Sequence, residues 1–261
     1  MISLEAAASS PRTAQTPQLY IGTSGWHYPH WQGTFYPERM KRNEWLAYYA
    51  TQFDCIEINN SFYRLPTAEQ VARWAAQTDD SFRFALKAPQ SITHRRKLRN
   101  CEQIVEQFLQ VAGVLDARRG PLLFQLPPRW HANPARLDTF LSLIPPDVRC
   151  TVEPRDTSWF CDEVYAVLRE RGAALCVYDL AEFEAPHIAT ADFVYVRLHG
   201  PKIAYHGNYH HLTLRRWARD IAQWQRQSKD VYVFFDNDEA AYAPRNARQL
   251  LKLCATAPAE R

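Results

Sequence analysis

The sequence predicts an α/β fold of the (β/α)8 TIM-barrel class in a single domain. Short apolar runs alternate along the chain with segments of helical spacing, which is typical of a mostly parallel sheet. Eight such runs occur in 261 residues, and a closed barrel of eight units needs about 250 residues. A doubly wound open sheet is the alternative, but the chain contains neither a G-x-G-x-x-G loop nor a P-loop.

The predicted strands are the short apolar runs, each long enough for a buried strand of a parallel sheet. Side chains alternate between the two faces of a strand, so each run presents one set of residues to the helices and the other to the lumen. In chain order the predicted strands are 19–23, 55–59, 82–87, 122–126, 149–155, 174–179, 193–199 and 231–237.

The predicted helices lie between these strands, where apolar residues recur every three or four positions. After the sixth strand the chain shows only a short or irregular connection. In chain order the predicted helices are 43–53, 68–77, 102–118, 134–144, 161–171, 214–227 and 245–254.

The barrel is expected to cover residues 19–254, between a disordered or loosely attached leader at 1–18 and a short tail at 255–261. The six cysteines form no C-x-x-C pair, so we expect reduced thiols and a cytoplasmic protein. No apolar run approaches 18 residues, which predicts no membrane span. A net charge of +3 does not by itself indicate nucleic acid or a membrane as a partner.

Ionisable residues stand at the ends of the predicted strands, on the face that points into the lumen. In the strand 193–199, for example, Arg197 and His199 share one face among apolar neighbours. The carboxyl ends of barrel strands converge where enzymes of this fold keep their chemistry. We therefore expect a charged ring at this end, made of Glu57, Lys87, Glu153, Arg155, Asp179, Arg197, His199 and Asp236.

The charged ring has two interpretations. Buried charges are costly and persist when they are paired or used, so the ring is either a self-satisfied ion-pair network or a functional pit. We favour the pit, because a network that served only stability would not need to gather at one end of the barrel.

Loops that follow the strands are rich in aromatic residues, which can stack on a sugar ring or a nucleobase, or can act as lids over the barrel. The sequences are "GTSGWHYPHWQGTFYP", "SFYRLP", "WF" at 159–160 and "KIAYHGNYHH". The basic segment "THRRKLR" at 93–99 is expected to be a solvated turn; the alternative is that it draws anions to the mouth of the barrel.

Long motifs spread over residues 19–254 resemble the YecE-like family, also called domain of unknown function 72. They are "IGTSGWHYPHWQGTFYP", "FDCIEINNSFYRLP", "FRFALKAPQSITH", "FQLPPRW", "TVEPRDTSW", "YVRLHG" and "VYVFFDN" followed by "APRNA". The resemblance implies a single-domain TIM barrel and no established reaction. It places the family's motif positions on Glu57, Asn59, Tyr63, Lys87, His94, Gln125, Glu153, Arg155, Trp159, Arg197, His199 and Asn237.

One position departs from that family pattern. The family's eighth strand usually carries two asparagines where this chain has Asp236 and Asn237. A role for the Asp236 carboxylate is therefore not expected to extend to the whole family.

The first functional hypothesis is an enzyme, resembling an isomerase or epimerase, that acts on a small polar or anionic sugar-like substrate by acid–base chemistry. The expected catalytic residues are Glu57 or Glu153 as general base and His199 or Lys87 as general acid. The expected substrate-binding residues are Asn59, Tyr63, His94, Gln125, Arg155, Trp159, Arg197 and Asn237.

A divalent metal, manganese or magnesium, is a variant of this hypothesis, held by Glu153, Asp179, His199 and Asp236. Three cations in the same pit, Lys87, Arg155 and Arg197, oppose it, so the default expectation is no metal and no other cofactor. Two further hypotheses remain open: a nucleic-acid-binding or endonuclease-like protein, and a barrel that binds a ligand without catalysis. The oligomeric state is left open.

Overall fold

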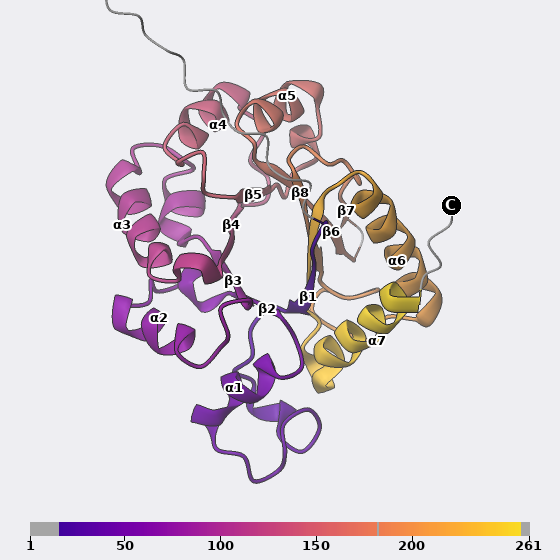
Figure 1. Cartoon of the computed structure of the whole chain (residues 1–261). Helices are drawn as coiled ribbons and strands as arrows, with labels where there is room; N and C mark the ends of the chain where they lie inside the picture. Colours follow the sequence, from indigo (N-terminus) through magenta and orange to yellow (C-terminus); the bar gives the residue numbers. More distant parts are fainter. Residues whose placement is uncertain (1–15, 182, 257–261) are drawn as a thin grey trace, which may run out of the picture.

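The computed structural model of this chain describes residues 16–181 and 183–256. Parallel strands surround a common axis with the helices outside them (Figure 1), which confirms the predicted (β/α)8 barrel. The barrel strands are β1 (Leu19–Thr23), β2 (Cys55–Ile58), β3 (Arg83–Lys87), β4 (Arg119–Gln125), β5 (Cys150–Glu153), β6 (Ala174–Leu180), β8 (Phe193–Leu198) and β9 (Asp230–Phe235). Most of the predicted leader (1–15) and tail (257–261) lies outside the described residues.

The helices occupy the predicted segments, with shifted ends. They are α1 (Trp45–Ala50), α2 (Ala68–Ala75), α3 (Glu102–Gly113), α4 (Pro134–Leu141), α5 (Asp162–Glu170), α6 (His211–Arg226) and α7 (Tyr242–Thr256). The predicted helix 102–118 ends at Gly113, and a separate 3-10 turn, η5 (Asp116–Arg118), follows it. After β6 the expected irregular connection contains a short strand, β7 (Phe183–Glu184), antiparallel to β6.

The sheet runs in the order β1-β9-β8-β6-β5-β4-β3-β2, and the barrel closes where β1 meets β2. This seam has few backbone hydrogen bonds: Ser24 pairs with Glu57, and the Gly25 amide donates to the Glu57 carbonyl at 2.8 Å. The Tyr49 hydroxyl of α1 bridges the two strands, because it accepts from the Thr23 amide at 2.8 Å and donates to the Cys55 carbonyl at 3.1 Å.

The predicted alternation of faces is present in the strands. The outward residues pack with the helices into one large apolar core, while the inward residues form a second cluster inside the barrel. That inner cluster fills the lumen up to the level at which the polar side chains begin, and it includes Cys55, Ala85, Leu123, Cys176, Tyr178, Tyr195, Tyr232 and Phe234. Among the described residues, no helix combines the length and apolar character needed to cross a membrane.

Candidate functional site

Arg197 stands at the centre of the charged ring and is 1% exposed. Its guanidinium donates to Glu57 through Nε and Nη2, with Nη2 at 2.8 Å from Oε1. Nη1 donates to Glu153 Oε2 at 2.8 Å, and Nη2 also reaches Asp236 Oδ2 at 3.2 Å. One guanidinium thus joins carboxylates from β2, β5 and the end of β9.

His199 is fully buried beside Arg197 and is held in one tautomer. Its Nε2 faces two donors, Nη2 of Arg155 at 3.1 Å and Nη1 of Arg197 at 3.3 Å, and so acts as an acceptor. Its Nδ1 therefore carries the proton and donates to Asp236 Oδ2 at 3.0 Å. The imidazole therefore links the two guanidinium groups on one side to the Asp236 carboxylate on the other.

Arg155 forms the upper edge of the ring. Its Nε donates to Glu153 Oε1 at 2.5 Å, and its guanidinium lies over the Tyr178 ring, 4.9 Å from the centroid. The Tyr205 ring stands perpendicular to His199 at 5.5 Å and is 45% exposed, so it covers this edge from the solvent side.

Lys87 differs from the other cations of the ring. It ends β3 on the inward face and is partly exposed, and its ammonium has no ion pair or hydrogen bond among the described residues. Its Nζ lies 4.5 Å from the centroid of the Phe62 ring. Burial, followed by the charge of Arg197, lowers the pKa of Lys87 from its usual 10.5 to about 8.

Two buried hydroxyl groups complete the ring, and the sequence analysis did not assign them. Ser24 Oγ donates to Glu57 Oε1 at 2.6 Å, and the Tyr195 hydroxyl donates to Glu57 Oε2 at 2.7 Å. With Arg197, these donors occupy both oxygens of Glu57. The inward position of Tyr195, two residues before Arg197, was a signal that could have identified it.

Asp179 does not join the ring, so that expectation is wrong. Its neighbours Tyr178 and Cys176 show which face of β6 points into the lumen: Tyr178, the adjacent residue, belongs to the inner cluster, and Asp179 therefore points outward. There its carboxylate accepts a hydrogen bond from the Tyr209 hydroxyl, and burial raises its pKa.

Asn237 and Trp159 were predicted to bind substrate, and the structure has both side chains buried with hydrogen bonds to neighbouring segments of the chain. Asn237 is buried, and its amide donates to the Gly207 carbonyl and to Asn246 of α7, which fastens the loop after β8. Trp159 is also buried, and its indole donates to the Trp130 carbonyl at 2.5 Å beneath the loops. In this arrangement the two residues support loops.

The remaining predicted binding residues lie around the accessible edge of the ring. Asn59 accepts from Arg197 at 3.5 Å, and Gln125 is beside Glu153 in the register of β4 and β5. His94 is half-buried, with Nδ1 held by Thr93 Oγ1 at 2.9 Å. Tyr63 is 77% exposed, and its ring contacts Phe62 edge-on.

A cavity of about 420 Å³ adjoins the ring on the side of β1 and β2. Its walls combine aromatic rings with amides, a combination suited to a polar ligand that has flat apolar faces. The 3-10 turn η3 (Asn60–Phe62) connects it to Lys87, because Asn60 lines the cavity and Phe62 lies against the Lys87 ammonium. The cavity is lined by Gly25, Trp26, His27, Tyr28, Asn59, Asn60 and Trp74.

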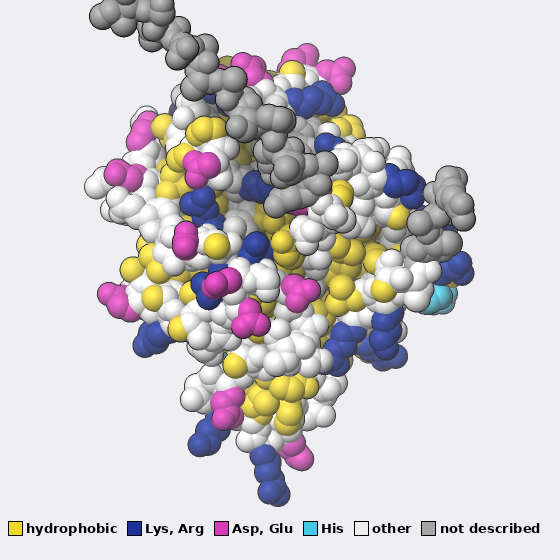
Figure 2. Space-filling model, viewed as in Figure 1, with side chains coloured by type: hydrophobic (Ala, Val, Ile, Leu, Met, Phe, Trp, Pro, Cys, Tyr) yellow, Lys and Arg dark blue, Asp and Glu magenta, His cyan; other side chains and the backbone are white. Residues whose placement is uncertain are grey.

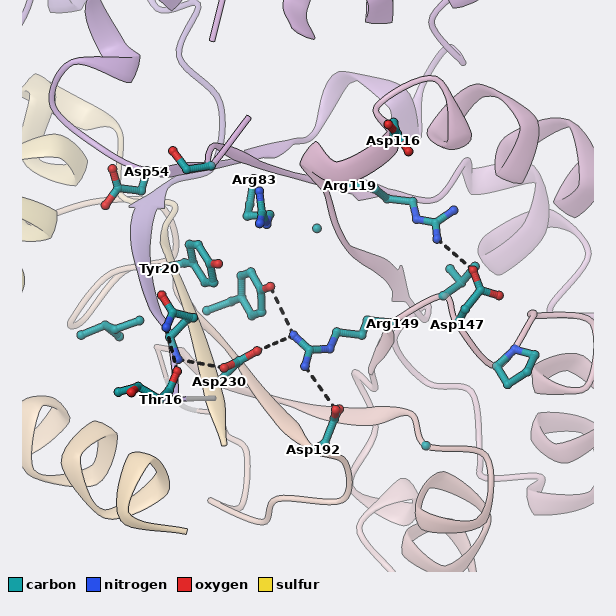
Figure 3. Close-up of a pocket in the computed structure, with 18 of the residues that line it drawn as sticks. Thr16, Tyr20, Asp54, Arg83, Asp116, Arg119, Asp147, Arg149, Asp192 and Asp230 are labelled. Atoms are coloured by element: carbon teal, nitrogen blue, oxygen red, sulfur yellow. Dashed lines mark hydrogen bonds and ion pairs between the residues drawn. The ribbon is translucent and has the colours of Figure 1, made fainter. Parts of the chain in front are cut away.

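A larger cavity, about 1070 Å³, opens at the opposite end of the barrel, around the residues that begin the strands. Its charged residues are largely paired with one another (Figure 3): Arg149 lies between Asp192 and Asp230, and Arg119 contacts Asp147. Because this face of a barrel serves stability rather than chemistry, we place the candidate site at the charged ring despite the smaller cavity there.

The residues suggested for a metal do not fit one. Among residues 16–181 and 183–256, no group of three or more His, Cys, Asp or Glu side chains is placed to hold a metal ion. Asp179 points away, and Glu153 already uses both oxygens for the guanidinium groups of Arg155 and Arg197.

Acid should weaken the fold through this ring. Burial alone would raise the pKa of Glu153, but the guanidinium groups of Arg155 and Arg197 outweigh it and hold that pKa well below the usual 4.5. The resulting stabilisation is complete above pH 4.5 and is lost as the pH falls below it. We expect the urea midpoint of Glu153→Gln to depend less steeply on pH between 5 and 3 than that of the unmodified protein.

The matched control for this measurement is Glu170→Gln, at an exposed position on α5. Its pH dependence should equal that of the unmodified protein. Equal slopes for Glu153→Gln and Glu170→Gln would contradict a stabilising, ionised Glu153.

Comparison with known proteins places these features in a family. The family model described as "Protein of unknown function DUF72" matches residues 20–261. The UPF0759 protein YecE of Escherichia coli K12 is 29% identical over 257 residues, covering 87% of this chain and 89% of that protein. The UPF0759 protein YunF of Bacillus subtilis is 26% identical, covering 90% and 94% of the two chains.

The fold is shared with a solved structure of a DUF72 family protein from Thermotoga maritima. The two superpose with a TM-score of 0.83 at 27% identity, over 91% of this chain and 99% of that one. Since the family model spans nearly all of the chain and the barrel matches that of a solved member, this protein belongs to the DUF72 family.

Proposed function

We propose that this protein is an enzyme that acts on a small, polar, sugar-like substrate by proton transfer next to a carbonyl group, with Lys87 as its reactive group. The observation that carries the proposal is the state of Lys87, a partly exposed amine without an ion pair among the described residues. Of the other charged groups of the ring, Glu57, Glu153, Arg197, His199 and Asp236 are paired and buried, and Arg155, at the edge, is paired with Glu153.

The ion pairs and hydrogen bonds of Glu57 and Glu153 argue against the role of general base that the sequence suggested for them. Glu57 accepts from Arg197, Ser24 and Tyr195, so both of its oxygens are already occupied by donors. Glu153 is held ionised between two guanidinium groups. We therefore propose that both carboxylates position Arg155 and Arg197. Proton transfer is assigned to groups at the accessible edge of the ring.

The cavity beside the ring supports a sugar-like substrate. Trp26, Tyr28 and Trp74 offer ring faces for the apolar side of a sugar, while the amides of Asn59 and Asn60 can pair with its hydroxyl groups. Arg155 adds a positive charge at the edge of the ring, which favours a substrate with an anionic or enolate-like oxygen.

The test is exchange of substrate hydrogen with solvent. The protein is incubated in D₂O with a panel of aldoses, ketoses and sugar acids, and deuterium at the carbon next to the carbonyl is detected by NMR. Exchange on at least one compound is expected, and Lys87→Met should lower its rate by at least about 100-fold. The rate of the unmodified protein should rise with pH and level off above about 8, as the amine loses its proton.

The matched control is Lys252→Met, an exposed lysine on α7 that should leave the rate unchanged. Lys87→Met is expected to fold. The lowered pKa means that protonated Lys87 opposes folding below about pH 8, and the opposition fades as the pH rises toward 10.5. An absence of exchange on every compound, or equal rates for Lys87→Met and Lys252→Met, would overturn the proposal.

Nucleic-acid binding is the second candidate, supported by the exposed cations Arg95, Arg96, Lys97 and Arg99. Figure 2 shows one face of the molecule, on which both signs of charge are interspersed. Binding of a single-stranded oligonucleotide that weakens steeply with salt would favour this candidate over the enzyme.

A further inference from the structure

We propose that Lys87 is a nucleophile that forms a Schiff base with an aldehyde or ketone substrate. The proposal rests on the function proposed above and names its substrate class, a small hydroxylated aldehyde or ketone. In the reaction the neutral amine forms a bond from Nζ to the carbonyl carbon. The carbonyl oxygen leaves as water with two protons, the one that the ammonium released on becoming neutral and one from the amine. The remaining amine proton stays on nitrogen, so the protonated imine carries the positive charge.

The first requirement is access to the amine. Lys87 shares the inward face of β3 with Ala85, which belongs to the cluster that fills the lumen, so the lysine is the last side chain of that row. It is partly exposed, whereas Arg197 and His199 are 1% and 0% exposed. A ligand that enters from the carboxyl ends of the strands therefore meets this amine before it meets the paired charges.

The second requirement is activation. An amine next to another cation, or removed from water, loses its proton more readily and becomes a nucleophile near neutral pH. Lys87 satisfies both conditions: it lies over the apolar Phe62 ring and close to Arg197, and its pKa is about 8. Its backbone carbonyl accepts from Ser61 Oγ at 2.7 Å, which fixes the base of the side chain.

The third requirement concerns the charge of the product. The ring contains the carboxylates of Glu57, Glu153 and Asp236, but its guanidinium groups are only those of Arg155 and Arg197. These three carboxylates favour a cation at Lys87. The protonated imine is a cation like the ammonium it replaces, so the product has the same charge beside these carboxylates as the resting lysine.

The fourth requirement is proton movement. His94 packs edge-on against the Phe62 ring, at 4.9 Å between centroids, and Lys87 lies against the same ring. Thr93 holds Nδ1 of His94, and no partner for Nε2 is present among the described residues. Burial, followed by the charges of Lys87 and Arg155, lowers the pKa of His94, so the imidazole is neutral at neutral pH. We assign it a proton relay, in which Nε2 takes up the proton that the Lys87 amine releases and passes it to the departing oxygen.

The experiment is reductive trapping. The protein is mixed at pH 7.5 with dihydroxyacetone or glycolaldehyde, sodium borohydride is added, and the modified lysines are identified by peptide mass spectrometry. At this pH an amine with a pKa of about 8 is neutral about 200-fold more often than an ordinary lysine. We therefore expect at least about 100-fold more adduct on Lys87 than on any other lysine, with Lys252 as the internal reference.

Two variants sharpen the result. Lys87→Met should remove the dominant adduct and leave the minor ones. His94→Phe should slow its formation while leaving the melting temperature close to that of the unmodified protein, because the aromatic contact with Phe62 is retained. Adducts spread evenly over the lysines, or none with either carbonyl compound, would overturn the Schiff base.

The outcome can be separated from that of the proposed function. The D₂O exchange measurement needs no covalent bond between the substrate and Lys87. Glycerol has hydroxyl groups like those of dihydroxyacetone but no carbonyl, so its protection of Lys87 against acetic anhydride measures binding alone. Failure of trapping together with Lys87-dependent exchange would sink the Schiff base alone. Failure of trapping, of exchange, and of protection of Lys87 by glycerol against acetic anhydride would sink both.

Discussion

Replacing Arg197 by leucine is expected to destabilise the protein by about 3–5 kcal/mol, the cost of breaking a buried ion pair by removing one partner. Arg197 is 1% exposed and joins Glu57, Glu153 and Asp236. Leucine fills part of the space but leaves these carboxylates facing one another without the cation that neutralises them. The free energy of unfolding, measured by urea titration with tryptophan fluorescence, checks the expectation.

The control is Arg215→Leu on the exposed face of α6, which should change stability by less than about 0.5 kcal/mol. A second expected result, a pH dependence of the stability loss, distinguishes Arg197→Leu from the control. The loss in Arg197→Leu should shrink as the pH falls toward 4.5, because burial and mutual repulsion raise the pKa values of the orphaned carboxylates and their protonation removes the repulsion. A loss below about 1 kcal/mol that does not vary with pH would show that water or neighbouring groups neutralise the carboxylates without Arg197.

The barrel and the charged ring could be predicted from the sequence because both depend on periodicity. Alternation along β8 places Tyr195, Arg197 and His199 on one face, and the structure has all three in the lumen. The same alternation of side chains corrects the placement of Asp179 in the ring. It was assigned to the ring because it ends a strand, but its neighbour Tyr178 is the residue that points inward. Position at a strand end is a weaker signal than parity.

Other features of the site could not be predicted because they depend on three-dimensional pairing. The sequence placed Lys87, Arg155 and Arg197 in one pit but could not distinguish the two arginines, which have carboxylate partners, from the lysine, which has none among the described residues. Trp159 and Asn237 lie in motifs of the family, yet their side chains hold loops from below. A family motif indicates that a residue type is required at a position. The burial of the side chain then shows whether it supports a loop or can contact a ligand.

Gly22→Ala should cost about 3 kcal/mol or more, although it adds a single methyl group to a strand. Gly22 lies in β1 at the seam with β2, where a Cβ atom would stand 2.2 Å from the Cys55 carbonyl oxygen and 2.9 Å from the Tyr49 hydroxyl. The first obstacle is backbone, which cannot rotate away as a side chain can. Either β1 and β2 separate or the Tyr49 bridge between them breaks.

The matched control is Gly113→Ala at the end of α3, where a Cβ atom would meet nothing within 4 Å. That variant should keep the stability of the unmodified protein or gain up to about 1 kcal/mol, since alanine favours a helix over glycine. If both variants were equally stable, the seam would tolerate a wider spacing than the hydrogen bonds of Tyr49 allow. The geometry argues against this: the same hydroxyl contacts both strands, so a shift that makes room for the methyl group must lengthen one of its two bonds.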